Sequence, residues 1–558
     1  MINYIVTMTS QEVESSKNEL KKWDTLIHNG VAFPPEYDYK GLSIKIKDKK
    51  ITLTPEQEEM AYAWAKKKDT PYVKDPVFIS NFLNDFLALF PEEFRDAKIE
   101  DIDFSELYKV VEEEKLAKES MSKEEKKMLA AERKKIREKM KEMYGWAEVD
   151  GNKFEVANWM VEPPGLFMGR GEHPLRGKWK PRVRASDIVL NLSEDAPVPE
   201  GEWKEIVHDH ESMWLAKWID KLTKKEKYVW LSDTAKLRQD RDKAKYDKAR
   251  ELGKQIDTVV KRIYKSMHSK DRKERMIATV CYLIYKLAMR VGDEKDPDEA
   301  DTVGASTLRV EHVKLNKDSI EFDFLGKDSV RWHKSIKIDK ENRILYENLK
   351  EFMKDKKEGE LIFSDITSRN VNQFLGKIVK GLTAKVFRTY LASDVVTRYL
   401  ATIDKELTTS EYAKIYHAKM ANLQAAVTCN HKRAPPKNFE NSLEKKKAKL
   451  EEIEKKLEEL KKTEAKTEKQ KERLEKRLAK IKERLEKTKF QIELALNTRD
   501  YNLNTSLRNY IDPRIFKAWC DYEGIDWTKL YSTSLQRKFQ WINRSSFKWE
   551  RLAKEGYK

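Results

Sequence analysis

Apolar residues recur at three- and four-residue steps through much of the chain, and this spacing predicts a mostly helical protein. Long helical patterns fill 235–290 and return from 344 to 429. A charged helical stretch covers 104–144, and Gly145 follows it as a glycine commonly follows a helix end. The last pattern before residue 290 places apolar residues where one helix face would enter a core, at Met276, Val280, Leu283 and Leu287.

Two other regions alternate between apolar and polar residues, which indicates strands. In the first, 42–46 and 51–53 alternate within a proline-punctuated stretch from 23 to 104, and the stretch is interpreted as a compact α+β module. In the second, 319–324 and 330–332 alternate around Gly326, which predicts a β-hairpin with a glycine-containing tip. The chain is therefore assigned to the α+β class, predominantly helical.

Residues 443–494 form a charged repeat with apolar positions at heptad spacing. The apolar positions lapse over 461–470 and then resume. Two short runs separated by a polar gap favour an antiparallel helical hairpin. The gap contains neither glycine nor proline, so a single long helix that dimerises stays open as the alternative. The lysines on the exposed faces suit either a solvated surface or a DNA-facing arm.

Charge narrows the class of partner. The 558 residues contain 113 Lys and Arg against 96 Asp and Glu, a formal charge of +17, which favours a polyanion such as nucleic acid. Aromatic residues make up 10% of the chain, so it is not a disordered basic tail.

Cys281, Cys429 and Cys520 have no paired spacing, and neither disulfides nor a zinc cluster are expected. No apolar run approaches the roughly 18 residues of a membrane span, and an intracellular protein is expected.

Tyr510 is the candidate nucleophile. It lies beyond the charged repeat and just before Asp512-Pro513, a pair that typically starts a helix. The positive end of that helix would favour tyrosinate or a bound phosphate. An ordinary packed aromatic is the alternative for Tyr510.

Cleaving a phosphodiester without a metal also needs cations around phosphorus and an acid for the leaving oxygen. The candidate cations are Arg290, Arg388 and His431, and the candidate acid is Lys327 at the predicted hairpin tip. Each has a plain alternative. Arg290 would end an apolar helix, where an arginine is favourable anyway, and Arg388 lies within a helical run and is similarly ambiguous. His431 would be a core histidine, and Lys327 a solvated lysine.

Two loops resemble phosphate-binding segments. The sequence around Gly326-Lys327 lacks the earlier glycine and the following Ser or Thr of a nucleotide phosphate loop, so no ATP site is expected. The loop 161–174 is dense in glycine and proline and contains Arg170, which could fork onto a phosphate approached by the backbone. A basic surface loop is the alternative.

Several segments, taken in order, resemble the eukaryotic-type DNA topoisomerase IB family. The similarity runs from about residue 23 to the carboxyl terminus. Its blocks are 163–171, 290–295, 301–304, 308–312, Phe-Asp-Phe-Leu-Gly-Lys-Asp-Ser at 322–329, 382–390 with Lys-Val-Phe-Arg-Thr-Tyr, 429–437, and Asn-Tyr-Ile-Asp-Pro-Arg at 509–514.

The resemblance implies a two-lobed DNA clamp with a coiled-coil linker and a small helical C-terminal domain. It divides the chain into a DNA-clasping cap (1–240), a catalytic core (241–434), an antiparallel coiled-coil linker (435–497) and a C-terminal domain with the nucleophile (498–558). Double-stranded DNA is the implied partner, and a monomer is expected. The enzyme would act with the chromosome, in the nucleus of a eukaryote or the cytoplasm and nucleoid of an archaeon.

The resemblance also implies a reaction. Tyr510 would attack a backbone phosphate to leave a 3′-phosphotyrosyl link, the duplex would rotate, and the free 5′-hydroxyl would reseal the strand. Supercoils of both signs would be relaxed without ATP, metal or any other cofactor. Arg290, Arg388 and His431 would stabilise the transition state and Lys327 would protonate the leaving oxygen. The implied DNA contacts are Arg170, Asn509, Asp328 and Lys437.

Two residues depart from the family pattern, and two rival functions stay open. Met168 stands where an arginine is expected in Phe-Arg-Gly-Arg-Gly, and Asp293 stands where an asparagine is usual, which puts sensitivity to camptothecin-type poisons in doubt. A tyrosine recombinase uses a similar set of residues, although the charged repeat between His431 and Tyr510 argues against it. A non-catalytic DNA clamp or chromatin scaffold would be equally basic.

Overall fold

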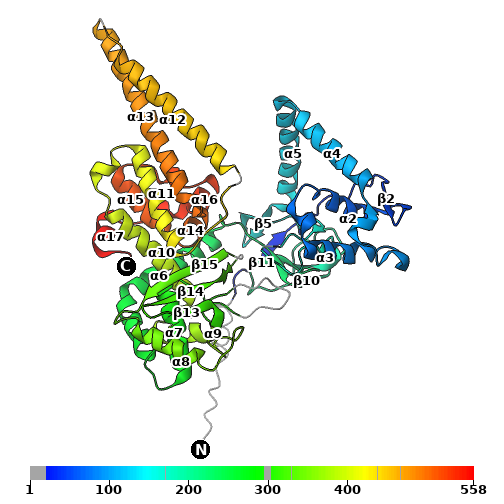
Figure 1. Ribbon diagram of the computed structural model, residues 1–558, viewed down its shortest axis with the longest axis horizontal. Coiled ribbons are helices and arrows are strands. Elements are labelled where there is room, and N and C mark those ends of the chain that lie inside the picture. The colour runs from blue at the N-terminus through cyan, green and yellow to red at the C-terminus, as the bar shows by residue number, and fades with distance from the viewer. Residues whose placement is uncertain (1–20, 170, 294–302, 328–329, 437, 466) are drawn as a thin grey trace, which may run out of the picture. The chain divides into compact units, whose positions relative to one another are not determined.

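The computed structural model describes residues 21–558 except 170, 294–302, 328–329, 437 and 466 (Figure 1). The chain divides into two compact units. The first comprises Met1–Arg238 with Asp296–Ala300, and the second comprises Gln239–Lys295 with Asp301–Lys558. Both units combine helices with small sheets, which confirms the α+β class. The functional division into cap, core, linker and C-terminal domain stays a prediction.

The described residues of the first unit form four sheets and four α-helices, besides the start of α6. Its helices are α2 (Pro55–Ala65), α3 (Pro76–Leu87), α4 (Ser105–Ser120) and α5 (Lys123–Tyr144). Its strands are β1 (Leu26–His28), β2 (Ser43–Ile46), β3 (Lys49–Thr52), β4 (Ile102–Asp103), β5 (Trp146–Val149), β6 (Asn152–Glu155), β7 (Gly165–Leu166), β8 (Trp179–Lys180), β9 (Ile188–Asn191), β10 (Glu205–Val207), β11 (Trp214–Ile219) and β12 (Glu226–Trp230). They pair in the orders β1-β5-β6, β3-β2-β4, β7-β8 and β10-β9-β11-β12 among the described residues.

Local sequence explains several of these elements. The predicted alternating pair is the antiparallel hairpin β2–β3, whose turn residues Lys47 and Asp48 both have positive φ (48° and 67°), as a tight two-residue turn requires. The predicted helical stretch 104–144 is two helices, because Ser122 caps a new helix start and accepts from the amide of Glu125. The four-stranded sheet β10-β9-β11-β12 was not predicted from the sequence.

Two hydrophobic cores stabilise the first unit. One lies under α2 and α3, where the rings of Trp64 and Phe82 stack with centroids 4.3 Å apart. The other lies against the four-stranded sheet and includes the fully buried Ile188 and Leu190. Burial of these large apolar side chains favours folding of the unit.

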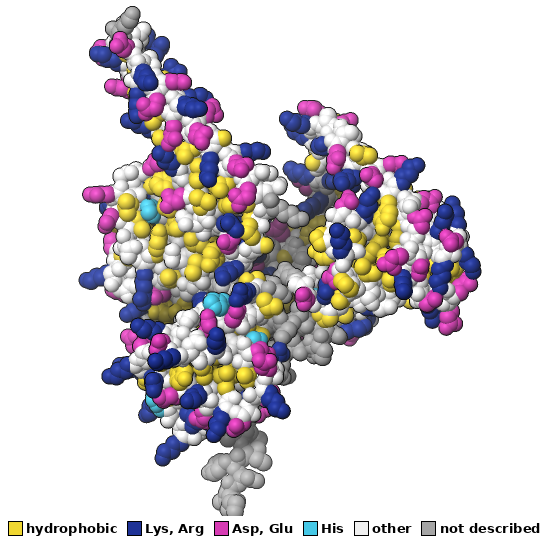
Figure 2. Space-filling view, viewed as in Figure 1, with side chains coloured by type: hydrophobic (Ala, Val, Ile, Leu, Met, Phe, Trp, Pro, Cys, Tyr) yellow, Lys and Arg dark blue, Asp and Glu magenta, His cyan; other side chains and the backbone are white. Residues whose placement is uncertain are grey.

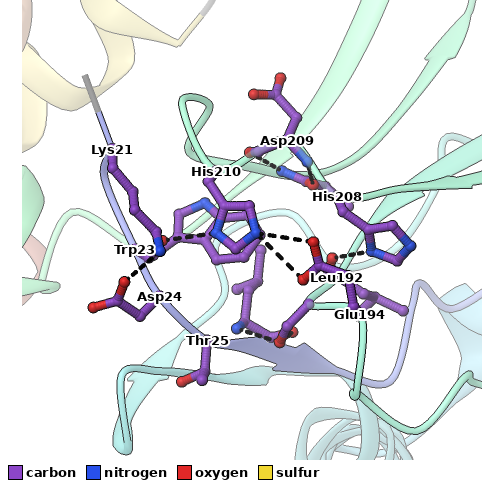
Figure 3. Close-up of polar contacts among 12 residues, drawn as sticks. Lys21, Trp23, Asp24, Thr25, Leu192, Glu194, His208, Asp209 and His210 are labelled. Carbon is purple, nitrogen blue, oxygen red and sulfur yellow. Dashed lines mark hydrogen bonds and ion pairs between the residues drawn. The ribbon is translucent and has the colours of Figure 1, made fainter. Parts of the chain in front are cut away.

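A polar network secures the first described residues against the loop that precedes β11 (Figure 3). Trp23 stacks on His210 with ring centroids 4.1 Å apart, and its indole N–H donates to the Ser212 carbonyl at 2.7 Å. Nε2 of His210 lies 3.3 Å from a carboxylate oxygen of Glu194. Among the described residues, no cluster of His, Cys, Asp or Glu is placed to hold a metal ion. These contacts hold the first described residues against the loop that precedes β11.

The second unit is mostly helical. Its helices are α6 (Lys236–Ser266, which begins in the first unit), α7 (Arg272–Leu287), α8 (Arg343–Met353), α9 (Ser368–Ile378), α10 (Ala384–Ala401), α11 (Glu411–Thr428), α12 (Phe439–Lys461), α13 (Glu468–Thr498), α14 (Leu503–Asn509), α15 (Pro513–Glu523), α16 (Thr533–Lys538) and α17 (Trp549–Glu555). Its strands are β13 (Val313–Leu315), β14 (Ser319–Gly326) and β15 (Val330–Lys337), in that order. A continuous hydrophobic core joins these elements apart from α12 and α13.

The predicted hairpin with the glycine-containing tip is confirmed. β14 and β15 pair antiparallel from Ser319 opposite Lys337 to Gly326 opposite Val330. The core-facing pattern of α7 is also confirmed, since Met276, Val280 and Leu283 are buried. The placement of Arg290 at the end of this helix is wrong. α7 ends at Leu287, and Ala288 takes a left-handed conformation (φ 52°) that turns the chain away before Arg290.

Helices α12 and α13 form an antiparallel pair (Figure 1). Ile453 and Leu457 are buried, and Lys489 on α13 pairs with Glu454 on α12 at 3.2 Å. The exposed surface of the pair is densely charged (Figure 2). The alternative of one continuous helix is wrong because the chain turns back between Lys461 and Glu468. Its role as a linker along DNA stays a prediction.

Candidate active site

The backbone around Tyr510 is held between two helices. Tyr510 follows α14, and its amide donates to the Ser506 carbonyl at 2.9 Å. The hydroxyl of Ser393 on α10 donates to the Tyr510 carbonyl at 3.3 Å and accepts from the Asp512 amide at 3.0 Å. Ser393 therefore joins the tyrosine segment to the core of the second unit.

Asp512 starts the next helix, as the sequence predicted. Its fully buried carboxylate accepts from the Arg514 amide at 3.0 Å and caps α15, which begins at Pro513. The same carboxylate accepts from the Arg514 guanidinium at 2.8 Å and from the Tyr557 hydroxyl at 2.8 Å. A buried charge needs such partners, so this network fixes the start of α15 next to the tyrosine.

The Tyr510 side chain meets three of the predicted site residues. A guanidinium nitrogen of Arg290 donates to its hydroxyl at 3.1 Å. The guanidinium carbon of Arg388 lies 5.1 Å from its ring centroid, and the imidazole of His431 lies 5.2 Å from it, centroid to centroid. Tyr510 is only 8% exposed. Folding thus brings together residues from four distant segments, while their catalytic roles stay predictions.

Three nitrogens at this site are buried without a hydrogen-bond partner among the described residues. They are Nε of Arg388 and both ring nitrogens of His431. The other Arg388 nitrogens are engaged, since Nη1 donates to the Ala288 carbonyl and Nη2 donates to the Cys429 carbonyl at 2.9 Å. A buried polar group without a partner costs about 1–3 kcal/mol. An anion with several oxygens would accept from the Nε–H of Arg388 and from the single N–H of a neutral His431 imidazole, while the other imidazole nitrogen would need a donor.

The charges of the arginines shift the acid–base chemistry of the site. Burial alone would raise the pKa of Tyr510, but the positive charges of Arg388 and Arg290 outweigh it and leave that pKa below the usual value of tyrosine. Burial, together with the same two arginines, lowers the pKa of His431 to about 3. The sequence predicted a cation at this position, and the role of His431 in stabilising a transition state stays a prediction. Near neutral pH its imidazole supplies an uncharged N–H donor.

The low pKa of His431 predicts a measurable pH dependence. The pKa of His431 is about 3 in the folded chain, against 6.5 for an ordinary histidine. The unfolded chain therefore binds a proton here more readily, so the contribution of the neutral His431 to stability is complete above pH 6.5 and is lost as pH falls. At pH 5 the loss should reach about 2 kcal/mol. We expect the melting temperature of the parent chain to fall more between pH 8 and pH 5 than that of His431→Gln. Equal falls would contradict the assignment.

Lys327 lies exposed at the tip of the β14–β15 hairpin. It lines a small cavity of about 40 Å³ together with Arg290, Arg388 and Trp332. The hairpin therefore places an ammonium group on the wall of the space that the two arginines also line. This placement is compatible with the predicted role as an acid, which stays a prediction.

The predicted DNA contacts are only partly covered by the structure. Arg170, Asp328 and Lys437 lie outside the described residues. Asn509 is exposed at the end of α14, where its amide donates to the Thr505 carbonyl at 3.2 Å, and its main-chain oxygen accepts from Lys245. Its predicted role in binding DNA stays a prediction.

The structure gives both departures from the family pattern a local setting. The partly buried Met168 packs against the core beneath α2 and α3, a position that suits an apolar side chain. The Asp293 carboxylate accepts from the amide of Ser368, the first residue of α9, at 2.9 Å. A negative charge at a helix N-terminus is favourable.

Lys334 on β15 is a residue that the sequence reasoning missed. Its ammonium group donates to the Leu287 carbonyl at 3.2 Å and to the Thr428 carbonyl at 2.9 Å. Burial lowers its pKa to about 8. A signal was present in the sequence, because Val330, Trp332 and Ile336 are the inward positions of this strand and Lys334 continues their two-residue spacing.

This geometry places a buried tyrosine hydroxyl beside two guanidinium groups, an arrangement of charge that suits an anionic ligand. Three family models then match the chain. The DNA binding fragment of eukaryotic DNA topoisomerase I matches residues 21–231, its catalytic core matches 234–464, and the C-terminal topoisomerase domain matches 482–551.

Curated relatives agree with these matches. DNA topoisomerase 1 alpha of Arabidopsis thaliana is 40% identical over 556 residues, covering 96% of this chain and 60% of the relative. DNA topoisomerase 1 of Homo sapiens is 36% identical over 550 residues, covering 93% of this chain and 70% of the relative. DNA topoisomerase 1 of Drosophila melanogaster is 36% identical over 547 residues, covering 95% of this chain and 55% of the relative. The chain belongs to the eukaryotic DNA topoisomerase I family, which confirms the predicted resemblance.

The chain spans about 60% of the length of the Arabidopsis relative. In the described part of the chain, no helix is both long enough and apolar enough to cross a membrane.

Proposed function

We propose that this protein relaxes supercoiled DNA of either sign by transient cleavage of one strand, through a 3′-phosphotyrosyl intermediate on Tyr510. The observation that carries the proposal is the set of buried, unpartnered nitrogens of Arg388 and His431 beside a tyrosine hydroxyl that accepts from Arg290. A backbone phosphate would supply the missing acceptors. Family membership supports the same conclusion.

In the proposed cleavage step the Tyr510 oxygen attacks phosphorus, and the bond from phosphorus to the 5′-oxygen breaks. The lowered pKa of Tyr510 eases loss of its phenolic proton to solvent, and the Arg290 N–H then stabilises the phenolate. Lys327 gives a proton to the departing 5′-oxygen, which leaves as a hydroxyl. Religation reverses these transfers. The phosphotyrosyl bond conserves the energy of the broken linkage, so neither ATP nor a metal is required in the proposed reaction.

Charge develops on the non-bridging oxygens as the tyrosine attacks. Arg290 and Arg388 would hold these oxygens with charge-assisted hydrogen bonds, and the neutral His431 would add an N–H donor. Arg388 and His431 are already buried beside Tyr510, and donors that are placed in advance reduce the reorganisation that accompanies a reaction. The three residues therefore favour the transition state over the resting phosphate.

The partner in this proposal is double-stranded DNA, bound by a monomer. Residues 1–240 would clasp the duplex, 241–434 would supply the catalytic cations, 435–497 would link the core to the tyrosine domain, and 498–558 would deliver Tyr510. Arg170, Asn509, Asp328 and Lys437 would contact the DNA near the cleaved phosphate. The protein would act on the chromosome, in the nucleus of a eukaryotic cell.

A plasmid relaxation assay tests the proposal directly. We expect the purified protein to relax negatively and positively supercoiled plasmid in EDTA and without ATP, because the proposed chemistry uses only side chains. Partly relaxed topoisomers resolved on an agarose gel measure the rate. A strict requirement for Mg²⁺ or ATP would falsify this mechanism.

A further inference from the structure

Two helices of the second unit end close to each other, and each end leads into a site residue. α7 ends at Leu287, and Arg290 follows three residues later; α11 ends at Thr428, and His431 follows three residues later. The last carbonyls of a helix have no partner within the helix. Here they are the atoms through which the two ends are joined.

Two cations bridge these ends in matching positions. Lys334 donates to the Leu287 carbonyl at 3.2 Å and to the Thr428 carbonyl at 2.9 Å. Arg388 donates to the next carbonyl of each segment, those of Ala288 and Cys429. We call the residues from Leu287 to Arg290 and from Thr428 to His431 the exit segments of α7 and α11. Each cation joins one carbonyl from each exit segment, and the negative C-terminal ends of both helices favour positive charge.

We propose that Lys334 is a positioning residue of the active site, which holds the ends of α7 and α11 in register so that Arg290 and His431 meet at Tyr510. The inference rests on the proposed function, because it assigns Lys334 to the same reaction. Lys334 itself need not touch DNA. Its effect would pass through the exit segments to the Arg290–Tyr510 hydrogen bond.

The surroundings of Lys334 favour a role in positioning over a role in stability. Its stem occupies an inward strand position, and its ammonium group lies 5.3 Å from the Trp332 ring. Burial lowers its pKa to about 8; Cys429 acts in the opposite direction, and the positive charges of Arg388 and Lys432 lower the pKa further. Replacing a buried charge with an apolar residue of similar volume is often neutral or stabilising.

Lys334 also complements Arg388. In the proposed reaction Arg388 must engage a phosphate, while two of its nitrogens hold the exit carbonyls. If the Arg388 guanidinium turns toward the phosphate, Lys334 still bridges the same two segments one residue earlier. The site can then keep its geometry while Arg388 serves the reacting anion.

The test compares Lys334→Met, Lys334→Arg and the control Lys337→Met with the parent chain. Methionine keeps an unbranched stem and removes the donors, arginine keeps donors, and Lys337 is exposed on the same strand. Single-turnover cleavage is measured on a DNA substrate that cannot religate, together with DNA affinity and melting temperature. We expect Lys334→Met to slow cleavage at least about ten-fold, since small misplacements are costly in a preorganised site.

In Lys334→Met, DNA affinity and melting temperature should be unchanged or higher. Lys334→Arg should recover part of the cleavage rate. Lys337→Met should match the parent in all three measurements. Cleavage by Lys334→Met within two-fold of the parent would overturn the inference. If Lys334→Met melts well below the parent, Lys334→Gln replaces it in the comparison. Cleavage by Lys334→Gln slowed about ten-fold then supports the inference, and cleavage within two-fold of the parent overturns it.

A second measurement separates this inference from the proposed function. The ionisation of Tyr510 is followed by absorbance, with a Tyr510→Phe background subtracted, in the parent and in Lys334→Met. A higher pKa of Tyr510 in Lys334→Met shows that the arginines have lost their placement and supports the inference; an unchanged pKa overturns it. A parent chain that forms no covalent complex with DNA defeats the proposed function, while this titration still decides the role of Lys334.

Discussion

Replacing Tyr510 with phenylalanine should leave DNA binding intact and abolish both plasmid relaxation and covalent trapping on DNA. The ring would keep its contacts with Arg388 and His431, and only the hydrogen bond from Arg290 would be lost. Loss of one such bond costs about 1 kcal/mol, which a folded domain tolerates. Loss of the nucleophile should reduce the cleavage rate by at least about 10⁴-fold.

The measurement is denaturing electrophoresis of the protein after incubation with labelled DNA, alongside fluorescence anisotropy for binding. Tyr522→Phe is a matched control, because Tyr522 is 39% exposed on the neighbouring helix α15. It should behave like the parent chain. A covalent complex that persists in Tyr510→Phe would show that another residue is the nucleophile.

Replacing Lys327 with alanine should slow cleavage of ordinary DNA by about 10²–10⁴-fold, the range in which a general acid contributes. Folding should be unaffected, because Lys327 is exposed at the hairpin tip and the register of β14 and β15 does not depend on its side chain. The rate is measured under single-turnover conditions. The defect should lie in the chemical step, so DNA affinity should change little.

A substrate with sulfur in place of the 5′-bridging oxygen distinguishes an acid from a general DNA contact. A thiolate leaves without protonation, so Lys327→Ala should cleave this substrate at nearly the parent rate. Lys317→Ala, at an exposed turn at the other end of the same sheet, is the control and should cleave both substrates normally. A persistent defect on the sulfur substrate would mean that Lys327 is not the acid.

Much of the second unit could be predicted because its signals are local. The apolar spacing of α7, the alternation of β14 and β15, and the Asp512-Pro513 start of α15 each express a preference within one short segment. The four-stranded sheet of the first unit carries no comparable signal. Its strand β9 is buried along its whole length and pairs with β10 in parallel and with β11 in the antiparallel direction, so neither alternation nor a tight turn marks it.

The identity of the candidate site residues could also be predicted, but not their physical state. Arg290 lies beyond the end of α7, because Ala288 turns the chain. The pKa of His431 falls to about 3, because folding buries it beside two arginines from distant segments. Both properties depend on which residues meet in space.

The sequence by itself determined the helical character, the β-hairpin, the family and the set of residue types around Tyr510, whereas it only favoured the turn back between α12 and α13 over one long helix. These follow from periodicity and from short motifs. Only the tertiary structure decided that Tyr510 is buried against Arg290, that His431 is uncharged and that Lys334 joins two helix ends. Burial and electrostatic interaction depend on distances between remote segments, and those distances exist only once the chain has packed.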